Sequence, residues 1–405
     1  MRLRRLWPWA TLFLTALPAL GQERVLTLDD ALALAREGGA GLARARGGVE
    51  EARAREVQAG RRFQESPVAE VNGGYRDAGE GYLDFEAAVS QGLDAGARRA
   101  ARRAGTRAAV ERAEADLAEA RRRLLRDVRI TFVRALAARE RIALLAKSRR
   151  AGDELLAATE RRYEAGEATA LELNRSRAAA ASARAEQAAA EAEESLETAH
   201  LKALLGLPAA EAVEVRGSLE AAPPLSLEAL LAGLDRRPDL QALAAELREA
   251  EAEILVGRSL ARPDIGLRGA VAREEGAEIV TAGVVLTLPV HGRGRETAAV
   301  GEARATALRR ELAQARARAG AEVRGRFEAL DRQLAAAGEL EKTALPALDD
   351  NESLALKSFE AGEIGLGELL LIRREILETR RAYLDRRLEA TLTRFELQAA
   401  AGDLP

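Results

Sequence analysis

The amino-acid sequence repeats itself, and the repeat limits the folds that are open to the chain. Tyr-Glu-Ala-Gly-Glu around Gly166 recurs as Phe-Glu-Ala-Gly-Glu around Gly362, 196 residues later. Pro67 and Pro263 have the same separation, and each opens a stretch in which apolar and polar residues alternate. Several landmarks in one order and at one spacing indicate two copies of a single structural unit.

Each copy is predicted to hold a helix, a strand pair, a long helix, a turn and a final helix. In the first copy, residues 22–220, these are a helix at 28–62, strands at 68–75 and 82–91, a long helix at 97–163, a turn near Gly166 and a helix at 168–205. In the second, residues 221–405, they are a helix at 227–260, strands within 264–289 (264–272 and 279–289), a long helix at 294–359, a turn near Gly362 and a helix at 367–402.

The long helices are predicted from their composition and their heptad spacing. No proline occurs from 68 to 207, and Val110, Leu117 and Leu124 recur every seven residues, as in a coiled coil. Aromatic residues make up only 3% of the chain, and Ala, Leu, Arg and Glu dominate it. A helix over 97–163 would be about 100 Å long, which no compact domain of this size needs.

The strands are predicted from alternation with period two. Leu83, Phe85 and Val89 alternate with the polar residues Asp84 and Glu86. Each strand is of a length that crosses a bilayer when tilted. Four strands are too few to close a barrel, yet strand edges in lipid must be paired. Several chains are therefore expected to share one barrel, with the long helices continuing below it as a tube.

Composition excludes several other classes of protein. The chain has no Cys and two distant histidines, His200 and His291, so we expect no disulfide, metal site, catalytic triad or cofactor. No phosphate loop or nucleophile elbow is present, so we predict that the chain is not an enzyme. The formal net charge is −3, and the arginine clusters alternate with acidic residues, so no nucleic-acid partner is expected.

Residues 1–21 have the pattern of a secretory signal peptide. Three arginines precede a short apolar segment, and small residues follow at Ala19 and Gly21. The apolar segment is too short for a membrane anchor, and no other stretch is apolar enough for a spanning helix. The sequence therefore predicts export from the cytoplasm.

Four motifs carry a resemblance to a known family over essentially the whole mature chain. They are Thr27-Leu-Asp-Asp-Ala-Leu, Arg237-Pro-Asp-Leu, Leu288-Pro-Val-His-Gly-Arg-Gly-Arg and Phe359-Glu-Ala-Gly-Glu-Ile. In their order, and with the duplication, they resemble the TolC-like outer-membrane efflux proteins, most closely the compact branch associated with heavy-metal and small-cation efflux.

The resemblance implies a fold, an assembly and a location. The fold is mainly α with a small β part. Long helices form a periplasmic tunnel, and four strands per chain contribute to a 12-stranded barrel that a homotrimer shares in the outer-membrane lipid. The family also implies a passive exit duct, docked on a periplasmic adaptor and an inner-membrane pump.

The resemblance further assigns roles to residues at the two helix tips and in the barrel. Adaptor docking is expected at both turns, where a plain helix–helix turn is the simpler interpretation: Tyr163, Gly166, Glu167, Leu171, Phe359, Gly362, Glu363 and Leu366. Glu368 aligns with an acidic position that rings the closed end of the tunnel, and Glu172 is its equivalent in the first copy. The family's second acidic position aligns with Leu371, which departs from the pattern. Both glutamates could instead be ordinary helix-surface residues.

Four charged residues lie on the polar phase of the predicted strands. They are Glu70, Asp84, Glu86 and Arg268. They are expected to face the barrel lumen, either to tune which ions pass or simply as solvated side chains. Two other functions stay open from the sequence: a periplasmic adaptor protein, which would show a single helical hairpin, and a soluble periplasmic coiled-coil scaffold, which would have no membrane strands.

Overall fold

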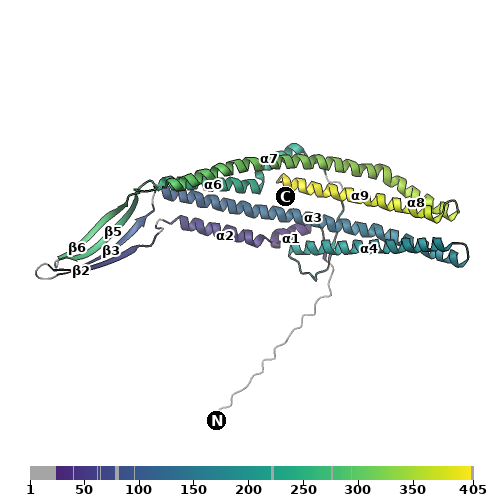
Figure 1. The fold of residues 1–405 in the computed structure, drawn as a ribbon, viewed down its shortest axis with the longest axis horizontal. Helices are drawn as coiled ribbons and strands as arrows, with labels where there is room; N and C mark the ends of the chain where they lie inside the picture. Colours follow the sequence, from purple (N-terminus) through teal and green to yellow (C-terminus); the bar gives the residue numbers. More distant parts are fainter. Residues whose placement is uncertain are drawn as a thin grey trace, which may run out of the picture.

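The computed structural model shows a long helical rod with a β-sheet at one end (Figure 1). It describes residues 24–39, 41–61, 63, 65–77, 82–94, 96–219, 223–274, 277–292 and 294–402. The predicted signal peptide, residues 1–21, lies outside the described residues. At the end of the rod opposite the sheet lie two helical turns, around Gly166 and Gly362.

The elements follow the same order in both copies. The first copy contains β1 (Arg24–Leu26), α1 (Leu28–Gly38), α2 (Leu42–Ala59), β2 (Val68–Arg76), β3 (Tyr82–Leu93), α3 (Ala97–Glu164), α4 (Ala170–Leu205) and β4 (Val213–Val215). The second contains α5 (Leu227–Ala232), the 3₁₀-helix η1 (Leu234–Arg236), α6 (Pro238–Ser259), β5 (Asp264–Glu274), β6 (Ala277–Thr287), α7 (Arg295–Glu339), the π-helical segment η2 (Leu340–Ala344), α8 (Leu345–Glu360) and α9 (Leu366–Ala400).

The sheet is antiparallel and joins the two copies. Its order is β2-β3-β5-β6, so β3 of the first copy pairs with β5 of the second, and β2 and β6 are left as edges. Residues directly opposite each other share a face, as Val89 and Gly269 do across the two copies. An open sheet of four strands with two free edges is an incomplete structure if it lies in lipid.

The two faces of the sheet differ sharply in polarity. One row across it is Val71, Ala87, Val271 and Val280, and the next row, on the opposite face, is Glu70, Ala88, Ala270 and Thr281. The apolar face is open in the protomer, where the side chain of Val280 is 80% exposed. A contiguous apolar surface of this kind marks a contact with lipid or with protein.

Four helices continue the strands in the same order. Below the sheet, α3 packs against α2 and α6, and α6 packs against α7, giving the order α2-α3-α6-α7. In the half of the rod that ends in the turns, α3 packs against α4 and α9, and α9 packs against α7 and α8. Two pairs of shorter helices, α2 with α4 and α6 with α9, therefore succeed each other along the rod beside the long helices.

Two helices that the sequence predicts as continuous are broken, at equivalent places. The predicted helix 28–62 is divided before Leu42, and the predicted helix 227–260 is divided before Pro238, 196 residues later. In the first copy Gly41 has a φ of 90°, a left-handed conformation that separates α1 from α2. In the second, the proline ring disfavours a helical conformation at Arg237 and then begins α6 at its first turn. The continuous-helix prediction was wrong at both sites.

The predicted helix 294–359 is also interrupted. The residues Leu340–Ala344 are π-helical, and Pro346 follows in the first turn of α8. Proline has no N–H group, and its ring clashes with the carbonyl four residues earlier, so the wider π turn accommodates it. The matching helix of the first copy, α3, has no proline and runs uninterrupted for 68 residues.

The largest hydrophobic core lies at the middle of the rod. Phe132 and Val128 of α3 are buried there together with Leu26 of β1 and Leu201 of α4. The strands β1 and β4 pair in parallel across this core, with Val25 opposite Glu214. The sequence analysis did not predict this two-stranded sheet, because strands of three residues carry little periodicity.

Candidate functional site

The turns at the far end of the rod have the same backbone conformation in both copies. Gly166 has a φ of 78° and Gly362 a φ of 76°. The N–H of Glu167 donates to the carbonyl of Arg162, and that of Glu363 donates to the carbonyl of Ser358, both at 2.8 Å. This is the Schellman arrangement, in which a left-handed glycine closes the helix. The glycines are therefore needed for the turn itself.

In the first tip, a capping box holds Glu172. The Oε2 atom of Glu172 accepts hydrogen bonds from the backbone N–H of Thr169 at 2.7 Å and from its hydroxyl at 2.9 Å. In return, the N–H of Glu172 donates to Thr169 Oγ1 at 3.2 Å. The backbone hydrogen bond, followed by the hydroxyl one, lowers the pKa of Glu172. Glu172 therefore caps the start of α4, and its carboxylate is directed at its own helix.

In the second tip, the equivalent carboxylate has no such partner. Gly365 replaces Thr169 at the N-cap, so no side chain caps α9. The N–H of Glu368 donates to the carbonyl of Gly365 at 3.1 Å. Its side chain is exposed and makes no hydrogen bond or ion pair within the part of the chain that the structure describes. Glu368 is thus available to solvent, ions or another protein in a way that Glu172 is not.

The packing beneath the two tips differs in the same way. Behind the first turn, Thr159 and Ser176 are buried, and their hydroxyl oxygens lie 3.0 Å apart in a hydrogen bond. The equivalent residues of the second copy are Ala355 and Ile372. Ala355 lies in an apolar cluster with Leu155, Leu366 and Leu369, and Ile372 packs against it.

The predicted docking residues are of two kinds: exposed side chains, and buried side chains that support the turn from within. The exposed side chains include Tyr163 and Leu171, which is 62% exposed. Phe359 is partly buried, with the guanidinium of Arg162 5.9 Å from the centre of its ring. Leu366 is only 3% exposed, so its side chain supports the tip from within and does not form part of a docking surface.

Three of the four predicted lumen residues meet on the polar face of the sheet. The guanidinium of Arg268 lies 2.9 Å from the carboxylate of Glu86 and 3.7 Å from that of Glu70. Asp84 is opposite Gly74 on the same face, nearer the hairpin end. The register, which the sequence alone does not give, brings these charges together across β2, β3 and β5.

A buried charged network that sequence reasoning missed joins the two ends of the second copy. Arg237 donates from Nη1 to the carbonyl of Ala400 at 2.7 Å and forms two hydrogen bonds to Asp239. Arg122 of α3 donates to the carbonyl of Ala399 at 2.7 Å and pairs with Glu119. Burial opposes ionisation of Asp239, but Arg237, together with Arg122 and the N–H of Leu240, outweighs it and lowers the pKa of that carboxyl.

The network explains the Arg237-Pro-Asp-Leu motif. The last carbonyls of α9 have no partner within the helix and lie at its negative end, so two guanidinium groups stabilise them. The side chain of Arg237 is buried at the point where α9 ends and α6 begins. Local sequence pattern does not reveal this contact, because Arg237 and Ala400 are 163 residues apart in the chain.

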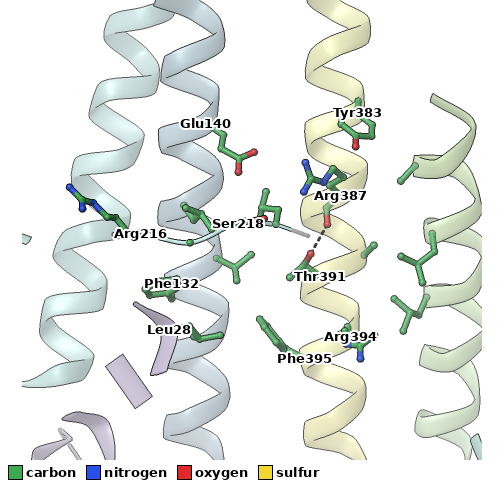
Figure 2. A pocket seen from close by; sticks show the side chains of 18 of the residues that line it. Leu28, Phe132, Glu140, Arg216, Ser218, Tyr383, Arg387, Thr391, Arg394 and Phe395 are labelled. Carbon is green, nitrogen blue, oxygen red and sulfur yellow. Dashed lines mark hydrogen bonds between the residues drawn. The ribbon is translucent and has the colours of Figure 1, made fainter. Parts of the chain in front are cut away.

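A cavity of about 770 Å³ lies at the middle of the rod between α3 and α9. Figure 2 shows Phe132 and Glu140 of α3 on one side and Tyr383, Arg387 and Phe395 of α9 on the other. The Arg387 guanidinium lies 5.5 Å from the centre of the Tyr383 ring. No residue that the sequence analysis predicted to be functional lines this cavity.

None of the helices that the structure describes is long and apolar enough to cross a membrane. Among the described residues, no three His, Cys, Asp or Glu side chains are grouped so as to hold a metal ion.

Comparison with known families agrees with the two-copy architecture. A model of the outer membrane efflux protein family matches residues 39–207 and again residues 232–403. The chain belongs to this family. The two matches correspond to the two structural copies, each with its strand pair, long helix and tip.

Individual relatives support the same assignment. The chain is 28% identical, over 297 residues, to the cobalt-zinc-cadmium resistance protein CzcC of Cupriavidus metallidurans, which covers 72% of this chain and 71% of that protein. The Campylobacter jejuni outer membrane channel CmeC superposes with a TM-score of 0.77 at 17% identity, covering 93% of this chain and 85% of CmeC. The Vibrio cholerae outer membrane protein VceC superposes with a TM-score of 0.78 at 17% identity, covering 93% and 96%.

The family gives the sheet and the rod their places in the cell. The protein is the outer-membrane channel of an efflux system, and proteins of this family form trimers with a β-barrel and a helical tunnel. The helical rod extends into the periplasm, which puts the tips farthest from the membrane. Proteins of this family work with an adaptor and an inner-membrane pump. This assignment favours the channel over the adaptor and scaffold alternatives.

Proposed function

We propose that three copies of this chain form a passive exit duct that receives its cargo at the tips from a specific periplasmic adaptor. The strongest support is that each end of the rod has exposed surface that no other part of the described chain covers. The sheet has two free edges and an open apolar face, and the tips present exposed side chains that no part of the described chain covers. Both ends are thus suited to partners.

The mass of the purified protein tests the assembly. The protein is extracted from the outer-membrane fraction, and its mass is measured by light scattering with the detergent subtracted. We expect a protein mass near three chains of 43.4 kDa, less any cleaved leader. A monomer or dimer that stays soluble without detergent would contradict the shared barrel.

The docking surface is proposed to consist of the exposed parts of both turns. Tyr163, Glu167 and Leu171 belong to the first turn, and Glu363 to the second. A photo-crosslinking residue at position 171 should capture the adaptor in cells, whereas one at Leu366 should not, because that side chain is buried. Equal capture at both positions would contradict the division between surface and support.

The cargo is proposed to be small metal cations. The similarity to CzcC supports this, because that relative is described as a cobalt, zinc and cadmium resistance protein. Deleting the gene should lower the tolerance of the cells to zinc, cobalt or cadmium, and restoring it should return that tolerance. Unchanged tolerance to all three, with lost tolerance to organic compounds, would overturn the proposal for the cargo and leave the duct intact.

Glu368 is proposed to form the periplasmic gate. Its carboxylate is exposed, unpaired within the described chain and located in the first turn of α9. Three such carboxylates around a narrow entrance would attract cations and repel one another. Glu368→Ala should raise the single-channel conductance, and an unchanged conductance would remove the gate assignment. The structure gives Glu172 a capping role instead, so we propose no gate there.

The charges on the polar face of the sheet are proposed to line the lumen. The apolar face must meet lipid, so Glu70, Asp84, Glu86 and Arg268 face inward. They give the lumen of each chain two more negative than positive charges. Arg268→Gln should therefore increase the preference of the open channel for cations, as measured by the reversal potential in a salt gradient.

A further inference from the structure

The segments that connect the sheet to the rod are unusually basic. Residues 60–66, 94–103, 258–264 and 291–296 contain ten arginines and only four carboxylates, although the whole chain has a net charge of −3. Each segment lies where a strand meets a helix. The charge excess is therefore local, at the level where the membrane part of the protein ends.

The arginines at this level form two groups. Arg98 and Arg102 are partly buried beneath the sheet and pair with Asp264 and Asp94. Arg99 also turns inward, since its Nη2 atom donates to the carbonyl of Gly60 at 2.7 Å. Each of these three guanidinium groups therefore has a partner within the protein.

Three other arginines are exposed and have no such partner. The side chains of Arg103, Arg262 and Arg295 make no hydrogen bond or ion pair with any residue in the described ranges. We call these three the junction arginines. Arg103 lies within the first two turns of α3, and Arg295 is the first residue of α7. The N-terminal end of a helix carries a partial positive charge, so a cation is unfavourable there unless an anion is near.

Exposed apolar side chains lie in or next to the same connecting segments. Phe63, Leu288 and Val290 are 55%, 64% and 67% exposed. Leu288 and Val290 continue the alternation of β6, in which Val284 and Leu286 lie on the apolar face of the sheet. The apolar surface therefore extends past the last strand residue, up to the connecting segment that holds Arg295.

Along the protein, an apolar surface is followed by unpaired cations. In a lipid leaflet, the hydrocarbon layer is likewise followed by a layer of charged head groups. The head-group layer is about 5–8 Å thick on each side of the hydrocarbon core, which corresponds to one or two turns of helix. Arginine is well suited to phosphate, because its planar guanidinium donates two hydrogen bonds at once. A long side chain at this depth can also place its charge in the head-group layer.

We propose that the junction arginines bind the phosphate groups of anionic phospholipids in the leaflet on the rod side of the outer membrane. The ring of nine arginines that three chains provide would fix the depth of the barrel in the membrane. The inference rests on the outer-membrane location of the sheet and is independent of the gate and of the cargo.

Native mass spectrometry of the delipidated trimer with added phosphatidylglycerol tests the proposal. The test variant is Arg103→Gln with Arg262→Gln and Arg295→Gln. The matched control is Arg150→Gln with Arg318→Gln and Arg332→Gln, three exposed arginines of the rod whose side chains also make no hydrogen bond or ion pair within the described ranges. An arginine near an anionic surface strengthens binding about fivefold, so the test variant should bind phosphatidylglycerol on the order of 100-fold more weakly. The control should bind like the wild type.

The other outcomes contradict the proposal. Equal affinity of the test variant and the wild type would overturn it, as would an equal loss in the control. If inorganic phosphate at equal concentration displaces the lipid, the site is one for free anions and not for lipid. If the triple variant does not assemble, Arg295→Gln alone and the salt dependence of wild-type binding replace it. Affinity that does not fall with added salt would then exclude a phosphate contact.

Discussion

The two tips of the rod share a backbone but differ in the chemistry around it. Both turns close with a glycine at positive φ and the same pair of hydrogen bonds. In the first tip, polar side chains are satisfied locally, by the Thr169–Glu172 capping box and the buried Thr159–Ser176 pair. In the second, apolar packing supports the turn and leaves its carboxylate unbound.

The difference shows how the two copies of a duplicated unit can keep one backbone and take different roles. The turn geometry needs only the glycine and the two helix ends, so both copies keep it. A single residue at the N-cap, Thr169 or Gly365, then decides whether the carboxylate three positions later holds the helix or faces the surroundings. The carboxylate of the first tip is accordingly structural, whereas that of the second is unpaired within the described chain, as the proposed gate requires.

The largest expected effect comes from removing the apolar support of the second tip. Leu369 is fully buried in the cluster with Leu155, so Leu369→Ala should destabilise the tip by about 2–5 kcal/mol. Hydrogen exchange of the α9 amides near residue 369 measures this local opening. Leu371→Ala, at a side chain that is 56% exposed, is the matched control and should change stability by no more than about 0.5 kcal/mol. A larger effect at Leu371 would contradict the described packing.

Exchanging the buried pairs between copies should have the next largest effect. Ser176→Ile alone adds bulk beside Thr159 and should cost about 1–3 kcal/mol. Adding Thr159→Ala makes the room that the second copy has, so the double variant should recover most of the loss. Local hydrogen exchange at the first tip gives both values. Additive losses in the double variant would show that the two positions are not coupled.

The N-cap residue can be exchanged with little effect on stability. Gly365 has extended backbone angles and no atom near the position of a Cβ, so Gly365→Thr fits and should bind Glu368 in a capping box. Stability should rise by only about a few tenths of a kcal/mol. Single-channel conductance should move in the same direction as in Glu368→Ala, because the carboxylate is drawn to its own helix. No change in conductance would mean that the orientation of Glu368 is irrelevant.

The smallest effect is a pH response limited to the first tip. The folded-state pKa of Glu172 lies below its ordinary value of 4.5, so the capping box contributes stability above that pH. The contribution should be lost as the pH falls from 4.5 through the lower folded pKa. Exchange of the α4 amides near Glu172 should therefore accelerate on acidification, relative to Glu172→Gln, in which the side chain does not titrate and the response should be absent. An equal response in that variant would exclude the capping box as its cause.

The sequence predicts the parts of this architecture that depend on periodicity and repetition. The strand pairs, the long α3 helix and the tip glycines follow from alternation, heptad spacing and the 196-residue offset. It does not predict which charges meet, because Arg268 reaches Glu86 only through the register of β3 and β5. The sequence does contain the capping-box pattern Thr-x-x-Glu at Thr169 and Glu172. The second copy has Gly365 in place of the threonine, so the pattern is missing at Glu368.

The breaks in the helices show a different limit. Pro238 and Pro346 are visible in the sequence, yet the first starts a helix and the second lies within an interrupted one. The outcome depends on tertiary packing: Arg237 is held by the end of α9, whereas the α7 and α8 helices continue around a π turn. Residues 163 places apart in the chain, Arg237 and Ala400, could not be paired from local pattern alone.

The most direct test of the account is the single-channel conductance of Glu368→Gln beside that of Glu172→Gln, measured in the same bilayers and salt. The two variants remove the same charge at equivalent positions of the two copies. The account predicts a higher conductance and weaker cation preference for Glu368→Gln, and wild-type values for Glu172→Gln. Equal changes in both variants, or a change in Glu172→Gln alone, would contradict the division of roles between the tips.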